Sequence, residues 1–211
     1  MKPTVFAAVV CLALIPASLI GAGPAGANPE DVLLTIDQIN AVVANYAPGA
    51  SPFDNFDPVR HQPDSPYEGL PAPCAQVLPL YFGGGEPRFS DYASLWTVGA
   101  GNVFVSQLVA RYATSAQAAT KFTQLVKDIP ACTDALTHQP AATLALTVGD
   151  ITSDSARFEQ RQTGSNSSLP NRHDVAVEYR LAGASIIGVS SSQSPAVVSA
   201  LAQELRGRVS G

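Results

Sequence analysis

The feature that most constrains the fold is a series of short segments, from residue 88 onward, in which apolar and polar residues alternate. Such alternation is typical of strands with one buried face. The predicted strands are 88–98, 102–112, 142–148, 155–163, 175–181 and 185–192. Glycine turns separate neighbouring segments at Gly99-Ala100-Gly101 and at Gly183, and tight turns join antiparallel strands. The sequence therefore predicts an antiparallel sheet of about six strands.

Three other segments place apolar residues at helical spacing. The predicted helices are 36–45, 115–128 and 195–208, with one or two helical turns at 74–81. Thr35 and Gln38 form a capping-box pattern before the first helix, and Thr114 or Ser115 is expected to cap the second. Pro130 is expected to end that second helix, because proline lacks the amide that a helix interior needs. Together, the strands and helices predict an α+β fold with the helices packed on one face of the sheet.

Residues 1–27 have the features of a signal peptide for export. Lys2 supplies a positive charge, Val5–Ile20 is apolar, and Ala25-Gly26-Ala27 provides small residues before a cleavage point. The apolar run is shorter than the roughly 20 residues of a membrane span, and no later segment is longer. We therefore expect a secreted or cell-envelope protein without a membrane span after cleavage.

Cleavage would remove Cys11 and leave two cysteines, Cys74 and Cys132. In an exported chain two cysteines predict a disulfide, and two free thiols are the alternative. The histidines lie far apart in the sequence and form no pair with a cysteine at metal-ligand spacing. We expect no metal site and no cofactor.

The length that remains after the signal peptide suits one domain. We divide it into an N-terminal helical part at 28–46, a loop at 47–73 and the remainder of the domain at 74–211. Prolines recur through 47–73 and exclude helix interiors and central strands. The loop is polar as well, so we expect it to be partly disordered.

Charge and motifs exclude several classes of function. The net charge of −5 and the scattered basic residues give no footprint for nucleic acid or anionic lipid. The sequence contains neither a Gly-x-Ser-x-Gly elbow nor a His-Glu-x-x-His zinc motif. We expect no catalytic residues, although a small hydrolase of unfamiliar type remains as a remote alternative.

One polar face of the predicted sheet is the candidate binding surface. Its members are Gln107, Arg111, Arg157, Arg161, Glu178 and Arg180. The guanidinium groups would suit a carboxylate or a phosphate, whereas an ordinary solvated sheet face is the simpler interpretation. Trp96 offers an aromatic floor for a sugar or lipid, with packing in the core as its alternative. His173 and Asp174 are adjacent in a strand, so they face opposite sides and form no acid–base pair.

Several sequence details, taken in order, resemble the PknH-like extracellular sensor domain of mycobacteria. The matching stretches are Val32–Asn40, Pro73-Cys74, Val109–Tyr112 running into Thr114–Ala119, Ile129–Cys132, and the final hairpin and helix at 195–208. The resemblance covers about residues 30–209. It implies an antiparallel sheet with helices around a cleft that binds an unidentified ligand.

The sequence departs from that pattern at one place. The kinase ectodomain of the family carries a second disulfide across its last strand pair, where this chain has His173 and Ser191 or Ser192. The resemblance implies a secreted sensor-type domain that binds a small molecule or envelope component without catalysis. A protein–protein interaction module of the cell envelope is the alternative.

Overall fold

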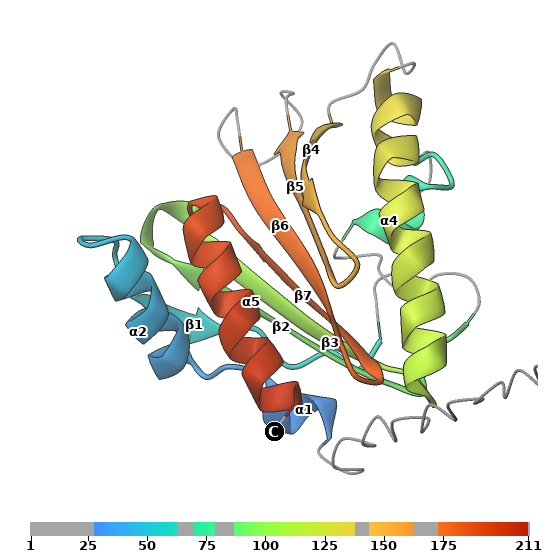
Figure 1. Cartoon of the computed structure of the whole chain (residues 1–211). Coiled ribbons are helices and arrows are strands. Elements are labelled where there is room, and N and C mark those ends of the chain that lie inside the picture. Colours follow the sequence, from blue (N-terminus) through green and yellow to red (C-terminus); the bar gives the residue numbers. More distant parts are fainter. Residues whose placement is uncertain (1–27, 63–69, 79–86, 138–143, 163–172, 211) are drawn as a thin grey trace, which may run out of the picture.

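A computed structural model describes residues 28–62, 70–78, 87–137, 144–162 and 173–210. The expected signal peptide at 1–27 and residues 63–69 of the proline-rich segment lie outside this range. The described residues form one open sheet with helices on both of its faces (Figure 1).

The sheet contains seven strands in the order β1-β2-β3-β7-β6-β5-β4, and every neighbouring pair is antiparallel. The strands are β1 (Phe53–Phe56), β2 (Asp91–Gly99), β3 (Phe104–Arg111), β4 (Leu144–Ile151), β5 (Ser155–Gln162), β6 (His173–Ala182) and β7 (Ser185–Ser191). Six of them correspond to the predicted segments, with ends shifted by a few residues. The antiparallel α+β prediction is confirmed.

The seventh strand, β1, lies within the proline-rich segment and extends the sheet edge beyond β2. The backbone of Phe53 is held by Asn40, whose side-chain amide accepts from the Phe53 N–H at 2.8 Å and donates to its carbonyl at 2.9 Å. Pro52 and Pro58 flank the strand without interrupting it. An edge strand tolerates prolines at its ends because only one side of it is paired.

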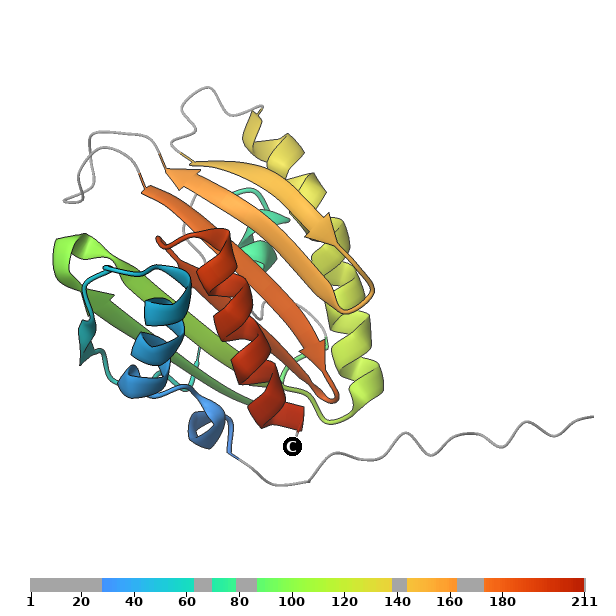
Figure 2. The same ribbon diagram turned by 60° about the vertical axis from the view of Figure 1, so that its left-hand side comes forward.

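The helices cover both faces of the sheet, whereas the sequence pattern suggested one. They are α1 (Pro29–Val32), α2 (Ile36–Tyr46), α3 (Cys74–Val77), α4 (Ser115–Thr137) and α5 (Pro195–Ser210), and a 3₁₀ turn, η2 (Ala100–Asn102), follows β2. The helices α1, α2 and α5 lie on one face, which we call the α5 side (Figure 2). The helices α3 and α4 lie on the other, which we call the disulfide side. Consecutive residues of the central strands β3 and β7 are buried. Both faces of the sheet centre therefore need helices to cover them.

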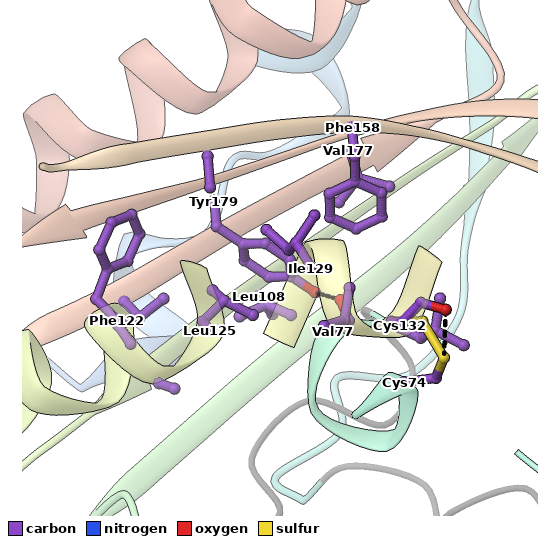
Figure 3. Close-up of a cluster of buried hydrophobic side chains, with 14 of the residues drawn as sticks. Cys74, Val77, Leu108, Phe122, Leu125, Ile129, Cys132, Phe158, Val177 and Tyr179 are labelled. Atoms are coloured by element: carbon purple, nitrogen blue, oxygen red, sulfur yellow. Dashed lines mark hydrogen bonds between the residues drawn. A yellow bond between two sulfur atoms is a disulfide. The ribbon is translucent and has the colours of Figure 1, made fainter. Parts of the chain in front are cut away.

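Each face has its own apolar core. On the disulfide side, Phe122, Leu125 and Ile129 of α4 pack against the sheet beside Phe158 and Tyr179 (Figure 3). On the α5 side, Val197, Val198 and Leu201 of α5 pack with Val109, Ile187 and other strand residues. Alternate residues of one strand therefore enter different cores, as the two-residue period of a strand requires.

Cys74 and Cys132 form the predicted disulfide, with an S–S distance of 2.03 Å and a Cα–Cα distance of 4.8 Å. It joins α3 to α4, and both cysteines are fully buried (Figure 3). The sequence pattern placed Cys132 beyond a helix that ends at Pro130, but α4 continues through both residues to Thr137. Pro130 removes one helical hydrogen bond, and the burial of Ile129 and Cys132 together with the covalent bond outweighs that loss.

Gly188 in the centre of β7 has a packing role. A Cβ atom at this position would lie 2.7 Å from the ring of Tyr179. The missing side chain thus makes room for Tyr179, whose hydroxyl donates to the carbonyl of Val77 in α3 at 2.8 Å. The glycine, the tyrosine and α3 form one packed unit on the disulfide side.

Candidate functional site

A groove of about 280 Å³ lies on the α5 side, between the first turns of α5 and strands β4, β5 and β6. Its lining residues are Thr147, Val148, Gly149, Asp150, Arg157, Phe158, Glu159, Ala176, Val177, Glu178, Pro195, Val198 and Ser199. Apolar groups of Pro195 and Val198 share this lining with hydroxyl and charged groups. Ligand sites in proteins commonly combine an apolar lining with a few polar groups.

Glu178 forms the polar centre of this region and is only 1% exposed. Its Oε2 accepts from Nε of Arg157 at 2.9 Å and from the Ser199 hydroxyl at 2.5 Å. Its Oε1 accepts from Nε of Arg180 at 2.6 Å. Two guanidinium groups therefore compensate one buried carboxylate, which would otherwise carry a large desolvation cost.

The same cluster attaches α5 to the sheet. Arg180 of β6 donates from Nη1 to the Gln203 side chain at 2.9 Å, and Ser199 lies one helical turn before Gln203. In the turn between β4 and β5, Oδ2 of Asp154 lies 3.0 Å from Nη2 of Arg206 in α5. The Thr152 hydroxyl, which donates to Asp154, and Arg206 keep the pKa of that carboxyl below its ordinary value. The groove wall that α5 provides is thus fixed by hydrogen bonds to buried and half-buried charges.

The alternation of the strands places all the predicted polar-face residues on the α5 side, but only Arg157 and Glu178 line the groove. Arg180 lies behind them and supports Glu178. Arg161 forms an exposed pair with Asp174, with Nε 2.7 Å from Oδ1, and this contact raises the pKa of the guanidinium. Arg111 is the last residue of β3 and pairs with Ser185 of β7, outside the groove lining.

The side-chain amide of Gln107 is not available to a ligand, because it forms hydrogen bonds with the backbone of Leu34. It is 2% exposed, accepts from the N–H of Leu34 at 2.8 Å and donates to the Leu34 carbonyl at 2.7 Å. The side-chain amide thereby satisfies the backbone between α1 and α2. Both of its polar atoms are used within the protein.

Trp96 lies on the disulfide side, away from the groove. Its ring stacks on Phe104 with centroids 4.3 Å apart and an interplanar angle of 12°. The two residues belong to the paired strands β2 and β3. Trp96 therefore does not share a site with the polar-face residues that the sequence grouped with it.

Sequence reasoning did not select Val148, Asp150, Pro195 or Ser199 as site residues. Val148 and Asp150 belong to a strand that looks ordinary in sequence, and Ser199 lies within an alanine-rich helix. Only the packing of α5 across β6 brings these residues together.

The groove combines hydroxyl, carboxylate and guanidinium groups with apolar ones. Its lining contains no histidine and no cysteine, and its buried carboxylate is neutralised by two arginines. Within the described ranges, no cluster of three or more metal-ligating side chains occurs. Among the same residues, no helix combines the length and apolarity that crossing a membrane requires.

Comparisons with known proteins agree with this architecture. The family model described as the PknH-like extracellular domain matches residues 24–205. The crystal structure of the extracellular domain of PknH from Mycobacterium tuberculosis is similar, with a TM-score of 0.63 and 14% sequence identity. The similarity covers 85% of this chain and 93% of that one. No curated protein matches in sequence.

Proposed function

Because the chain belongs to the PknH-like extracellular domain family, we propose that it acts outside the cell as a sensor-type domain that binds a small ligand in the groove beside α5. Binding is non-covalent and no reaction follows. Export depends on residues 1–27, and cleavage after Ala27 leaves Asn28 as the first residue. Asn28 suits this position, because its side chain accepts from the N–H of Glu30 at 3.1 Å and caps α1.

The observation that carries the proposal is the use of one buried carboxylate to orient the groove wall. Glu178 fixes Arg157 on the sheet and Ser199 on α5, and both of these residues line the groove. Side chains held in this way lose little conformational entropy when a ligand arrives, which favours binding. A surface that merely needed solvation would gain nothing from a buried charge, because burial costs free energy.

The groove suits a ligand that combines an apolar body with neutral polar groups. The guanidinium of Arg157 is already engaged by Glu178 and lies 3.7 Å from Asp150. Glu159 adds another carboxylate to the lining. An anionic ligand would therefore meet carboxylates beside a guanidinium that is already in use, so we favour a neutral or zwitterionic ligand.

The test is native mass spectrometry of the protein purified from the culture medium of its own source organism, before and after denaturation. We expect an extra mass that dissociates on unfolding. Thr147→Trp places a large side chain in the groove and should abolish that mass, because Thr147 lines the groove and pairs with Glu159 on the α5 side. Thr123→Trp is the matched control, because Thr123 is also an exposed threonine and belongs to α4, outside the groove lining.

Each outcome has a meaning. Loss of the mass in Thr147→Trp with retention in Thr123→Trp supports the groove. Retention in Thr147→Trp overturns it, and loss in Thr123→Trp alone moves the ligand to the opposite face. A bare polypeptide in the unchanged protein contradicts small-molecule binding and favours a protein–protein interaction module.

A further inference from the structure

We propose a second binding site, for a neutral sugar ring, on the disulfide side of the sheet. It consists of Trp96, Phe104, Ser106 and Ser190, which we call the aromatic–serine patch. Trp96 comes from β2, Phe104 and Ser106 from β3, and Ser190 from β7. The groove beside α5 lies on the other face, so the two proposals are independent.

The aromatic half of the patch is a pair of stacked rings, in which each ring keeps one outer face that the other ring does not cover. The rings of Trp96 and Phe104 stack nearly parallel, 12° apart and with centroids at 4.3 Å. Neither ring is fully buried, because both residues have intermediate exposure. The outer face of such a partly exposed ring accommodates the apolar C–H face of a sugar, since indole and phenyl rings combine large contact area with a rigid shape.

The hydroxyl half lies directly beside it. The sheet register places Trp96 opposite Ser106 and Ser106 opposite Ser190, so the three side chains stand in one row on one face. Ser106 is 8% exposed and Ser190 is 4% exposed. Across the described part of the chain, neither hydroxyl has a hydrogen-bond partner, and neither is among the fully buried polar atoms that lack one. Both hydroxyls are therefore open to solvent or to a ligand.

Two nearby serines differ from Ser106 and Ser190, because their hydroxyls form hydrogen bonds within the protein. The Ser191 hydroxyl donates to the carbonyl of Phe104 at 2.6 Å, and the Ser192 hydroxyl accepts from the Phe104 N–H at 3.1 Å. Those two hydroxyls complete the backbone hydrogen bonds at the strand ends. Ser106 and Ser190 make no such bond, and their donors and acceptors are available to a ligand.

The charge of the patch defines the class of ligand. Its row continues from Ser190 to Val177, and none of these residues is ionisable. A charged ligand would be desolvated there without an ion-pair partner, at a large cost. A neutral ring with several hydroxyl groups satisfies the serines and stacks on the aromatic pair.

The position of α4 leaves this end of the face free of that helix. It packs on β4, β6 and β7, and both views show it at the β4 side, away from the β2–β3 hairpin (Figures 1 and 2). Trp96 and Phe104 lie at the hairpin end of their strands, where β2 ends at Gly99 and β3 begins at Phe104.

The protein contains a single tryptophan, so intrinsic fluorescence reports on the patch directly. We titrate the mature protein with glucose and, as a charged counterpart, with glucose 6-phosphate. Glucose should change the Trp96 emission with a dissociation constant in the range of about 1–10 mM, typical of a small ligand with few contacts. Saturation transfer from protein to sugar protons provides a second readout that does not depend on the fluorophore.

Two variants test the assignment. Ser106→Ala combined with Ser190→Ala should weaken glucose binding by at least about tenfold, because two neutral hydrogen bonds are lost and each loss weakens binding by about three- to tenfold. Ser185→Ala is the matched control. Ser185 is a buried serine of β7, as Ser190 is, but its side chain faces the α5 side. Thermal melting of both variants verifies that each is folded.

Three results would overturn the proposal. The first is the absence of both signals with glucose up to about 100 mM. The second is stronger binding of glucose 6-phosphate than of glucose. The third is an equal loss of affinity in the double variant and in Ser185→Ala, since that result would assign the effect to strand stability and not to the hydroxyls.

Discussion

The two faces of the sheet hold their helices by different means. On the disulfide side, α3 and α4 are joined by a covalent bond and packed through apolar side chains, and α3 also accepts hydrogen bonds from Tyr179 and Lys121. On the α5 side, apolar contact is supplemented by polar side chains that reach across elements. Gln107 binds the backbone of Leu34, Glu178 binds Ser199, and Arg208 donates to the carbonyl of Leu33 at 2.8 Å.

The difference shows what each kind of contact achieves. Apolar contact is non-directional and tolerates small displacements of a helix. Hydrogen bonds to buried charges require defined distances and angles, and they become costly when one partner is lost. On the groove face, α5 is bound to the sheet by several such contacts, which include Ser199 and Gln203. We infer that position matters more there than on the disulfide side, where the covalent bond mainly restricts the unfolded chain.

The largest expected effect concerns the disulfide. Replacing Cys74 and Cys132 together by alanine should lower the free energy of unfolding by up to about 4 kcal/mol, because the bond closes a long loop in the unfolded chain. Urea denaturation of both proteins measures the difference. Reduction of the unchanged protein should lower its melting temperature by about 10 °C, and an unchanged melting temperature would contradict this stabilising role.

The next effect concerns the buried carboxylate. Glu178→Gln leaves two guanidinium groups without their counter-charge and should cost about 3 kcal/mol. Asp174→Asn is the matched control, because it removes the carboxylate of an exposed pair with Arg161 and should cost less than about 1 kcal/mol. Urea denaturation at neutral pH compares the two variants. Equal losses of stability in the two variants would show that the buried Glu178 cluster contributes no more than the exposed pair of Arg161 and Asp174.

Two buried tyrosines on the disulfide side provide a finer test. The Tyr179 hydroxyl donates to the carbonyl of Val77, whereas the Tyr112 hydroxyl is buried without a hydrogen-bond partner in the described structure, and burial raises its pKa. Tyr179→Phe should cost about 1–2 kcal/mol because it leaves a buried carbonyl unsatisfied. Tyr112→Phe should be neutral or slightly stabilising.

Thermal and urea unfolding of the two phenylalanine variants measures this difference. A loss in Tyr112→Phe as large as that in Tyr179→Phe would show that both hydroxyls are satisfied in solution. The disulfide side would then depend on polar contacts as the α5 side does, and the comparison of the two faces would fail at this point.

The smallest effect concerns pH. The pKa of Asp154 is lowered in the folded protein from its ordinary value of 3.8, so its contribution to stability is present above that value and is lost as pH falls through the folded pKa. Asp154→Asn should remove a few tenths of a kcal/mol at neutral pH and make the loss of stability below pH 4 shallower. Urea midpoints between about pH 2 and 7 measure the slope. An unchanged slope would show that Thr152 and Arg206 do not stabilise this carboxylate.

Local rules were sufficient for much of the fold. The capping box at Thr35 and Gln38 forms as the spacing predicts, and Thr114 caps α4 through its hydroxyl, which accepts from the N–H of Gln117 at 3.2 Å. The alternating segments become strands because a two-residue period matches one buried face. These features depend on neighbouring residues only, which is why a sequence reveals them.

Other features depended on contacts between distant segments. The strand β1 relies on Asn40, and α4 passes Pro130 because Cys132 is tied to Cys74. The predicted polar face separated into a structural amide at Gln107, an exposed pair at Arg161 and the cluster around Glu178. Residue type alone does not distinguish these roles, because each depends on which partner lies within hydrogen-bonding distance.

The sequence by itself determined the antiparallel strands, the positions of the longer helices and the cysteine pair, since periodicity, capping and cysteine count are local or compositional properties. The tertiary structure alone decided that helices cover both faces, that Glu178 is buried between two arginines and α5, and that Trp96 stacks on the face opposite the groove. The physical reason is that burial and hydrogen bonding are set by the crossing of elements far apart in the chain, and no local pattern records where those crossings occur.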